Sequence, residues 1–236
     1  MRADIEEWKM DSYKRFVELR GGISLPDDHV QFLLQLKGEG LTPSVIYDIG
    51  SSVLHWYDAA KALWPDSMII PFEAMSEVKD LYRDAGVETF VCGFVLSDRT
   101  GDVTDFYQNL YHPGGNSVYR ENSQYSPNAD TLFPPLSAIE KVTVTLDDMV
   151  AGRQLPFPDL IKMDVQGAEL DVLKGATNTI AHCNHVILEL QHVDYNVGAP
   201  KRDQVILHME TLGFSLKCRF TGDENSVDGD YYFARV

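Results

Sequence analysis

The feature of this chain that most constrains its fold is a regular alternation of short apolar runs with helical stretches, which starts near Val45. The runs that predict strands are residues 44–50, 67–73, 88–98, 159–165 and 184–191. The stretches that predict helices are residues 58–64, 76–86, 168–182 and 203–213. Such an alternation is typical of right-handed strand–helix–strand crossovers. We therefore expect an α/β fold, with a mostly parallel sheet and helices on both faces.

The chain departs from this alternation at both ends. Residues 4–20 predict an amphipathic helix that ends at Gly21-Gly22, and a second helix is expected over residues 27–38. At the other end, residues 214–220 and 230–236 predict a hairpin that would give the sheet an antiparallel edge.

The predicted organisation is therefore an N-terminal helical extension over residues 1–40, followed by one domain over residues 41–236. Within that domain, residues of about 99–140 are rich in Gly, Pro, Asn, Ser and Tyr and interrupt the alternation. A segment of this length inside a compact domain is usually a functional loop. We expect a hairpin around Thr100-Gly101 at its start and a strand with a helical turn over residues 141–150 after it.

The charge balance of the chain excludes several classes of partner. Twenty Lys and Arg residues against 36 Asp and Glu residues give a formal net charge of −16. A surface of this sign repels phosphate backbones and anionic lipid, so we expect neither nucleic-acid nor membrane binding. No apolar run approaches the roughly 18 residues of a membrane span, and the first residues lack the apolar core of a secretory signal. A cytoplasmic protein is expected.

Polar residues stand at the carboxyl ends of the expected strands, which is where open α/β sheets bind ligands. The candidates at this edge are Asp48, Gly50, Ser51, Glu73, Asp164, Glu189 and His192. Cys92, Cys183 and Cys218 lie far apart and form no CxxC pair, so neither a disulfide framework nor a zinc ribbon is expected.

The turn after the first strand favours one kind of ligand. It carries a single glycine, Gly50, and the chain has neither G-x-G-x-x-G nor a Walker motif, which disfavours NAD, FAD and ATP. Glu73 follows Asp48 by 25 residues, near the roughly 20-residue offset at which an acid contacts ribose hydroxyls. Two acids and a glycine turn without a phosphate cradle suit a cationic nucleoside joined to an amino acid. S-adenosylmethionine is such a molecule.

Several segments resemble the FkbM family of S-adenosylmethionine-dependent methyltransferases. They are VIYDIGSSV, PFEA, VTVTLDDM, DLIKMDVQGAELDVLKGA and HVILELQ, which occur in the family's order over roughly residues 45–192. The resemblance implies a Rossmann-like class I methyltransferase fold. It also implies O-methyl transfer, commonly to sugar or polyketide hydroxyls.

The resemblance also implies roles for individual residues. Asp48, Gly50 and Ser51 would line the methionine end of the cofactor, Glu73 would hold its ribose, and Asp164 would face the transferred methyl group. The family's D-x-G-A-N-x-G turn departs here, with Ser52 in place of Asn and Leu54 in place of the second Gly. We expect Ser52 and the following His55 to contact the cofactor as well. The usual Glu of DVEGAE is Gln166, so any role that needs that carboxylate is lost.

Methyl transfer to a hydroxyl needs a general base or a divalent metal that lowers the pKa of the hydroxyl. Asp164 and His192 are the candidate bases. Glu169 is a further catalytic candidate, although an acid in the first turn of a helix is also expected for reasons of the helix dipole. In the alternative with a metal, Asp164, Glu189 and His192 would bind Mg²⁺ or Mn²⁺. For Asp164, an ion pair with Lys162 on the same strand face is the structural alternative.

The acceptor would be a small molecule or glycan, and residues 106–126, rich in Tyr and Asn, would cover it as a lid. The alternative from another class is a cofactor-binding module of the same fold without turnover, which the changes at Leu54 and Gln166 favour. A nucleotide-sugar-modifying enzyme with a different cofactor is a second alternative, which the missing phosphate loop disfavours. A homo-oligomer is compatible with all three.

Overall fold

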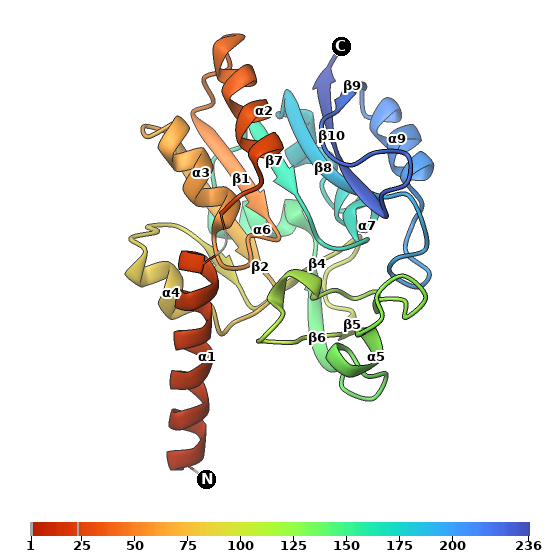
Figure 1. Cartoon of the computed structure of the whole chain (residues 1–236). Helices are drawn as coiled ribbons and strands as arrows, with labels where there is room; N and C mark the ends of the chain where they lie inside the picture. The colour runs from red at the N-terminus through yellow and green to blue at the C-terminus, as the bar shows by residue number, and fades with distance from the viewer. Residues whose placement is uncertain (1, 23) are drawn as a thin grey trace.

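The computed structural model describes residues 2–22 and 24–236, with side chains from Asp11 onward. Its centre is a seven-stranded sheet with the strand order β3-β2-β1-β7-β8-β10-β9 (Figure 1). The strands are β1 (Val45–Ile49), β2 (Met68–Glu73), β3 (Val91–Cys92), β7 (Leu160–Met163), β8 (His185–Gln191), β9 (Phe214–Arg219) and β10 (Asp228–Arg235). Strands β3, β2, β1, β7 and β8 run parallel, and β10 lies antiparallel between β8 and β9. The parallel sheet and the C-terminal hairpin are therefore confirmed.

Both faces of the sheet are covered, which explains why its central strands β1, β2 and β7 are mainly apolar. Alternate residues of β1 point to opposite faces: Ile46 belongs to one core cluster and Tyr47 to the other. The Ile46 cluster contains side chains of α1 (Arg2–Gly22), α2 (Asp27–Gly38), α3 (His55–Leu63) and α4 (Lys79–Asp84). The Tyr47 cluster contains side chains of α6 (Leu146–Arg153), α7 (Glu169–Lys174), α8 (Thr177–Ala181) and α9 (Arg202–Thr211).

Two predicted elements are divided by glycines. The strand predicted over residues 88–98 is two short strands, β3 and β4 (Val95–Leu96), in different sheets, because Gly93 between them has a φ of +92°. The helix predicted over residues 168–182 is divided into α7 and α8 at Gly175. A Cβ at Gly175 would overlap the carbonyl oxygen of Ser97, so this position tolerates no larger residue without a shift of the backbone.

The interrupting segment folds onto a second, three-stranded sheet with the order β4-β6-β5. Strand β6 (Ile139–Val144) pairs in parallel with β4 and antiparallel with β5 (Val103–Phe106). The hairpin predicted around Thr100-Gly101 is therefore wrong, since β6 separates the two strands that would have formed it. The remaining short helices are η1 (Pro113–Gly115) and α5 (Ala129–Leu132).

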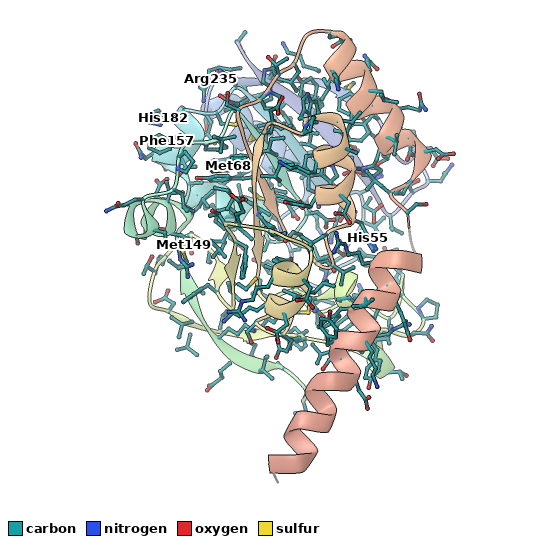
Figure 2. The ribbon with its side chains drawn as sticks, turned by 90° about the vertical axis from the view of Figure 1, so that its left-hand side faces the viewer. His55, Met68, Met149, Phe157, His182 and Arg235 are labelled. Carbon is teal, nitrogen blue, oxygen red and sulfur yellow. The ribbon has the colours of Figure 1, made fainter. Side chains whose placement is uncertain are left out.

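The N-terminal helix α1 reaches away from the domain, and its C-terminal end meets α3 (Figure 1). Arg20 makes two hydrogen bonds to the Asp58 carboxylate of α3, at 2.7 and 2.8 Å. One ring nitrogen of His55 lies 3.0 Å from the Leu19 carbonyl oxygen, at the contact seen in Figure 2. These contacts fix the end of α1 beside the carboxyl end of β1. Among the described residues, no helix is both long and apolar enough to span a membrane.

Candidate functional site

Two adjoining cavities lie beyond the carboxyl ends of the central strands. The first, which we call the β2 cavity, has Phe72, Phe94, Leu96 and Phe106 among its walls, with Glu73 at the end of β2. Its mostly apolar walls with a few polar groups are those of a site for a flat, partly apolar ligand.

The second cavity, which we call the α2 cavity, shares a wall with the first. Gly50, Ser52, Pro113, Gly114 and Asp164 line both cavities. The α2 cavity is otherwise lined by residues from distant parts of the chain, among them Arg15, His29, His55, Lys162 and Glu189. The first cavity is therefore mainly apolar, whereas the second has many charged walls. Residues 111–118 contribute to both, so the interrupting segment covers this edge of the sheet as predicted for residues 106–126.

Glu73 is the acid of the β2 cavity, and the backbone fixes its carboxylate. One oxygen accepts a hydrogen bond from the Ser52 backbone N–H at 2.8 Å, and the other accepts one from Met75 at 2.9 Å. Burial raises the pKa of Glu73, while these backbone donors lower it. A carboxylate has about four acceptor sites, so each oxygen keeps capacity for a ligand hydroxyl.

Gly50 is required for a reason that the sequence did not reveal. Its φ is +78°, and a Cβ there would overlap the backbone carbonyl oxygen of Asp164. The glycine therefore lets the turn after β1 approach the turn after β7. Ser52 and Leu54 also have positive φ, at 45° and 75°. The turn thus keeps a left-handed backbone at two positions where the related family has Asn and Gly, and Leu54 is fully buried.

Asp48 does not line either cavity, so its contact with the cofactor stays a prediction. Its side chain is fully buried, and neither oxygen has a hydrogen-bond partner among the described residues. Burial raises the pKa of Asp48 to about 6, against the opposing effect of Lys162, whose Nζ lies 3.9 Å from Oδ1. Asp48 caps no helix either, so the structure assigns it to the charge balance of Lys162.

A buried charge cluster forms the floor of the α2 cavity. Lys162 Nζ lies 3.2 Å from Asp164 Oδ2, so the ion pair considered from the sequence is present. The Gln166 amide donates to Asp164 Oδ1 at 2.8 Å and to Glu189 Oε2 at 2.5 Å. A Glu at position 166, as in the related family, would place a third carboxylate here. The amide instead links the two acids as a neutral donor.

The two acids of this cluster differ in protonation. Burial would raise the pKa of Asp164, but the neighbouring Lys162 ammonium and hydrogen bonds hold it below its ordinary value. Burial and the Asp164 charge raise the pKa of Glu189 well above its ordinary value. Asp164 is therefore the acid of the two that ionises more readily. Asp164 lines both cavities, and its place between them is consistent with the role predicted for it.

Glu169, the other catalytic candidate, lines neither cavity. Its carboxylate accepts hydrogen bonds from the backbone N–H groups of Val165 at 2.9 Å and Gly167 at 3.3 Å. Burial raises the pKa of Glu169 to about 7. Its contacts fix the turn after β7, in which Gln166 and Gly167 both have positive φ. These contacts give Glu169 a structural role in the turn, and the catalytic role expected for it stays a prediction.

His192 is also engaged away from the cavities. Its two ring nitrogens lie 2.9 Å from the Ser226 carbonyl oxygen and 2.8 Å from the Tyr231 hydroxyl. The predicted metal ligands Asp164, Glu189 and His192 form no metal-binding group, because no cluster of three or more His, Cys, Asp or Glu side chains in the described part of the chain is placed to hold an ion. The geometry likewise gives His192 no position as a base.

The remaining residues predicted to contact the cofactor lie at different places around the two cavities. Ser51 and His55 line the α2 cavity. The Ser51 hydroxyl is 2.6 Å from the Tyr82 hydroxyl, and the Tyr82 hydroxyl also donates to the Ser52 carbonyl oxygen at 2.8 Å. These hydrogen bonds stabilise the turn after β1. Ser52 lies on the shared wall, where a ligand in either cavity would meet it.

Three residues of the site were missed. Asn116 lines the β2 cavity, and its buried Nδ2 has no hydrogen-bond partner among the residues described. Arg15 and His29 line the α2 cavity. Arg15 Nε and His29 Nδ1 are likewise buried and have no hydrogen-bond partner among the residues described. No pattern in the sequence identifies Arg15 or His29, because both lie in the helical extension, before the first strand.

The residues of the β2 cavity fit S-adenosylmethionine. The apolar walls suit a base, the buried Glu73 suits the ribose hydroxyls, and the Asn116 amide nitrogen offers an unused donor. The ionised Asp164 stands on the wall toward the second cavity. When bound, this cofactor supplies an activated methyl group on a sulfonium.

Comparisons with known proteins relate the chain to methyltransferases. Residues 56–216 match the family described as methyltransferase FkbM domain. Over 134 residues the chain is 44% identical to Hexuronic acid methyltransferase AglP of Haloferax volcanii, covering 56% of this chain and 54% of that protein. Over 147 residues it is 26% identical to Methyltransferase 1 of Beauveria bassiana, covering 56% of this chain and 58% of that protein. The chain thus spans little more than half the length of these curated relatives.

Among solved structures, the fold is similar to that of magnesium protoporphyrin IX methyltransferase from Synechocystis PCC 6803 with bound SAH. The TM-score is 0.51 at 11% identity, and the whole of each chain is covered. At this identity the likeness concerns the fold alone, which is the class I methyltransferase α/β fold with antiparallel C-terminal strands. The predicted fold class is confirmed.

Proposed function

The chain belongs to the methyltransferase FkbM domain family, and on that premise we propose that it transfers a methyl group from S-adenosylmethionine to a hydroxyl oxygen of a sugar or glycan. The observation that carries the proposal is the pair of adjoining cavities with Asp164 on their shared wall. One cavity suits the nucleoside and the other leaves room for an acceptor beside it. Transfer needs both ligands held in line, which a shared wall provides.

The cofactor part of the proposal rests on Glu73 and its surroundings. A carboxylate fixed by two backbone donors is preorganised to accept hydrogen bonds from a ribose diol. Glu73→Gln would turn an amide N–H₂ toward one of those donors and remove the charge. We expect the affinity for S-adenosylhomocysteine, measured by isothermal titration, to fall about tenfold or more, since bonds to charged groups contribute roughly 1.5–3 kcal/mol.

Glu88→Gln is the matched control, because Glu88 is an exposed acid whose loss changes the net charge equally. Its affinity should equal that of the unaltered chain. Failure of the unaltered chain to bind S-adenosylhomocysteine at all would overturn the proposal. Binding without transfer to any acceptor would favour the alternative of a cofactor-binding module.

The acceptor part of the proposal draws on the similarity to Hexuronic acid methyltransferase AglP and on Arg15. Its buried Nε atom has no hydrogen-bond partner among the described residues, and Arg15 lines the α2 cavity. An unused guanidinium donor suits an acceptor that carries a carboxylate. An acidic sugar is therefore our proposed acceptor class.

Two glycosides that differ only in a carboxylate test this class: methyl glucuronoside and methyl glucoside. We expect at least about tenfold faster methylation of the glucuronoside, and loss of that preference in Arg15→Gln. Arg83→Gln, at a 64% exposed position of α4, is the control. Alkaline treatment of the product distinguishes an ether on a hydroxyl, which is stable, from an ester on the carboxylate, which is cleaved.

A further inference from the structure

His29, in the first turn of α2, is placed like a catalytic imidazole. Its side chain is 15% exposed and lines the α2 cavity. One ring nitrogen, Nε2, lies 3.1 Å from Asp230 Oδ2. The other, Nδ1, is buried and has no hydrogen-bond partner among the described residues. The imidazole is therefore held on one side and unoccupied on the other.

Asp230 is itself a fixed group. It lies in β10, where it pairs in register with Glu189 of β8, and its side chain is 7% exposed. Its Oδ2 also accepts a hydrogen bond from the Thr221 hydroxyl at 2.7 Å. The Phe220 ring meets the imidazole of His29 edge-on, with the ring centroids 5.5 Å apart. A carboxylate at Nε2 selects the tautomer with its proton on Nε2, which leaves the lone pair on Nδ1.

We propose that His29 is the general base for the acceptor hydroxyl and that Asp230 is its positioning residue. The inference rests on the proposed function. As the acceptor oxygen forms its bond to the methyl carbon, the carbon–sulfur bond breaks and its electron pair stays on sulfur. His29 Nδ1 takes the hydroxyl proton, and the Asp230 carboxylate balances the imidazolium. The proton then passes to solvent, which restores the neutral ring.

Other groups at the site are less suited to this role. Asp164 is paired with Lys162 and accepts from Gln166, so its carboxylate is already stabilised in the ionised form. Glu189 accepts a hydrogen bond from the Gln166 amide. His192 has both ring nitrogens engaged. His29, in contrast, lines the α2 cavity, has one ring nitrogen without a partner among the described residues, and has its tautomer fixed by Asp230.

The pH dependence of the rate would reflect His29 within its charged surroundings. Asp230 approaches from β10, and Glu189 of β8, Lys162 of β7 and Asp164 after β7 line the same cavity. The other titratable groups on the same cavity wall are Arg15, His55, Tyr111 and His112. A single ionisation that disappears with His29 alone would separate His29 from these groups.

The kinetic test uses the full chain, saturating S-adenosylmethionine and methyl glucuronoside. We expect His29→Asn to lower the single-turnover rate by roughly 10²–10⁴-fold, the range for loss of a general base. The rise of the rate with pH seen in the unaltered chain should also disappear. Affinity for S-adenosylhomocysteine should change less than about threefold, because His29 does not line the β2 cavity. His29→Gln serves if the Asn variant fails to fold.

His182→Gln is the matched control. His182 is an exposed histidine that stacks on Phe157, away from His55 in Figure 2. Its loss should leave the rate unchanged. Asp230→Asn should lower the rate less than loss of the base itself, because the imidazole remains.

A second readout needs no turnover. Nitrogen-15 spectra of the ligand-free chain, with His29 assigned by its absence in His29→Asn, should report the Nε2–H tautomer. Asp230→Asn should shift it toward a mixture. An Nδ1–H tautomer, a wild-type rate in His29→Asn, or an alkali-labile ester product would overturn the inference while leaving methyl transfer intact. If the unaltered chain neither binds S-adenosylhomocysteine nor forms product, both the inference and the proposed function fail.

Discussion

The β2 cavity and the α2 cavity share a wall, but their polar groups are held in place in different ways. Besides Asp164 on the shared wall, the β2 cavity has mainly apolar walls and one acid, Glu73, which backbone N–H groups hold in place. The floor of the α2 cavity is a network of side chains from different strands, in which Lys162, Asp164, Gln166 and Glu189 fix one another. A backbone-held site tolerates changes of neighbouring side chains, whereas a side-chain network depends on every member.

The largest effect should come from the shared wall, because it belongs to both cavities. In Gly50→Ala the new Cβ would overlap the Asp164 carbonyl oxygen. We expect a loss of about 3–5 kcal/mol in the free energy of unfolding, measured with urea, from overpacking and the left-handed backbone together. Gly101→Ala isolates the backbone part: its φ is +93°, but its Cβ meets no atom within 4 Å. Equal losses in the two variants would show that the overlap relaxes freely.

We expect Asp164→Asn to lower the rate of methyl transfer much more than the affinity for the cofactor. It removes the ionised acid from the cluster, and we expect the single-turnover rate to fall about 100-fold or more. Affinity for S-adenosylhomocysteine should change less than about threefold, because Glu73 and the apolar walls remain. Asp203→Asn, at an 83% exposed position of α9, is the control. A parallel fall in affinity and rate would mean that the two cavities do not act as distinct sites.

The pH dependence of the free energy of unfolding tests the role of Glu169 in the turn after β7. Because burial raises the pKa of Glu169 to about 7, the folded chain binds this proton more tightly than the unfolded chain does. The resulting stabilisation is present in acid and is lost as the pH rises through about 7. Glu169→Gln cannot titrate, so its stability relative to the unaltered chain should improve by about 2 kcal/mol between pH 5 and pH 8.

Urea unfolding at the two pH values measures this difference. Glu210→Gln, on an exposed position of α9, should show none. If Glu169→Gln behaves like Glu210→Gln, then Glu169 titrates as an ordinary acid and the turn after β7 does not depend on its proton.

The smallest effect is expected at Ser52, on the shared wall. Its φ of 45° is a conformation that Asn adopts more readily than Ser. Ser52→Asn should therefore stabilise the chain by roughly 0.5 kcal/mol, and its backbone N–H should still hold Glu73. Thermal unfolding and titration with S-adenosylhomocysteine measure both. A weaker affinity would show that the Ser52 side chain itself contacts the ligand.

The sequence predicted the β2 side well for a physical reason. Glu73 ends an apolar run, and the side chains at strand ends of a parallel sheet meet at one edge. The parallel sheet, the C-terminal hairpin and the helices predicted over residues 4–20 and 27–38 followed from local patterns in the same way. Breaks at Gly93 and Gly175 did not, because each depends on a neighbour distant in the sequence, such as Ser97.

The α2 side could not be predicted because its pairs are non-local. His29 meets Asp230 and Gln166 meets Glu189 only after the sheet is assembled. The proximity of Asp48 to Lys162 was not predicted either, because it depends on the pairing of β1 with β7. Leu54 is another case, since the chain keeps the left-handed backbone without the expected glycine.

Pro113 and Gly114 lie on the wall that the two cavities have in common. A ligand in either cavity would rest on this same pair, so the first to arrive would settle its position for the second. The two binding equilibria are then thermodynamically linked, and each ligand must alter the affinity of the other by the same factor. Such a linkage would make the occupancy of the donor depend on the concentration of the acceptor, whichever of the two binds first.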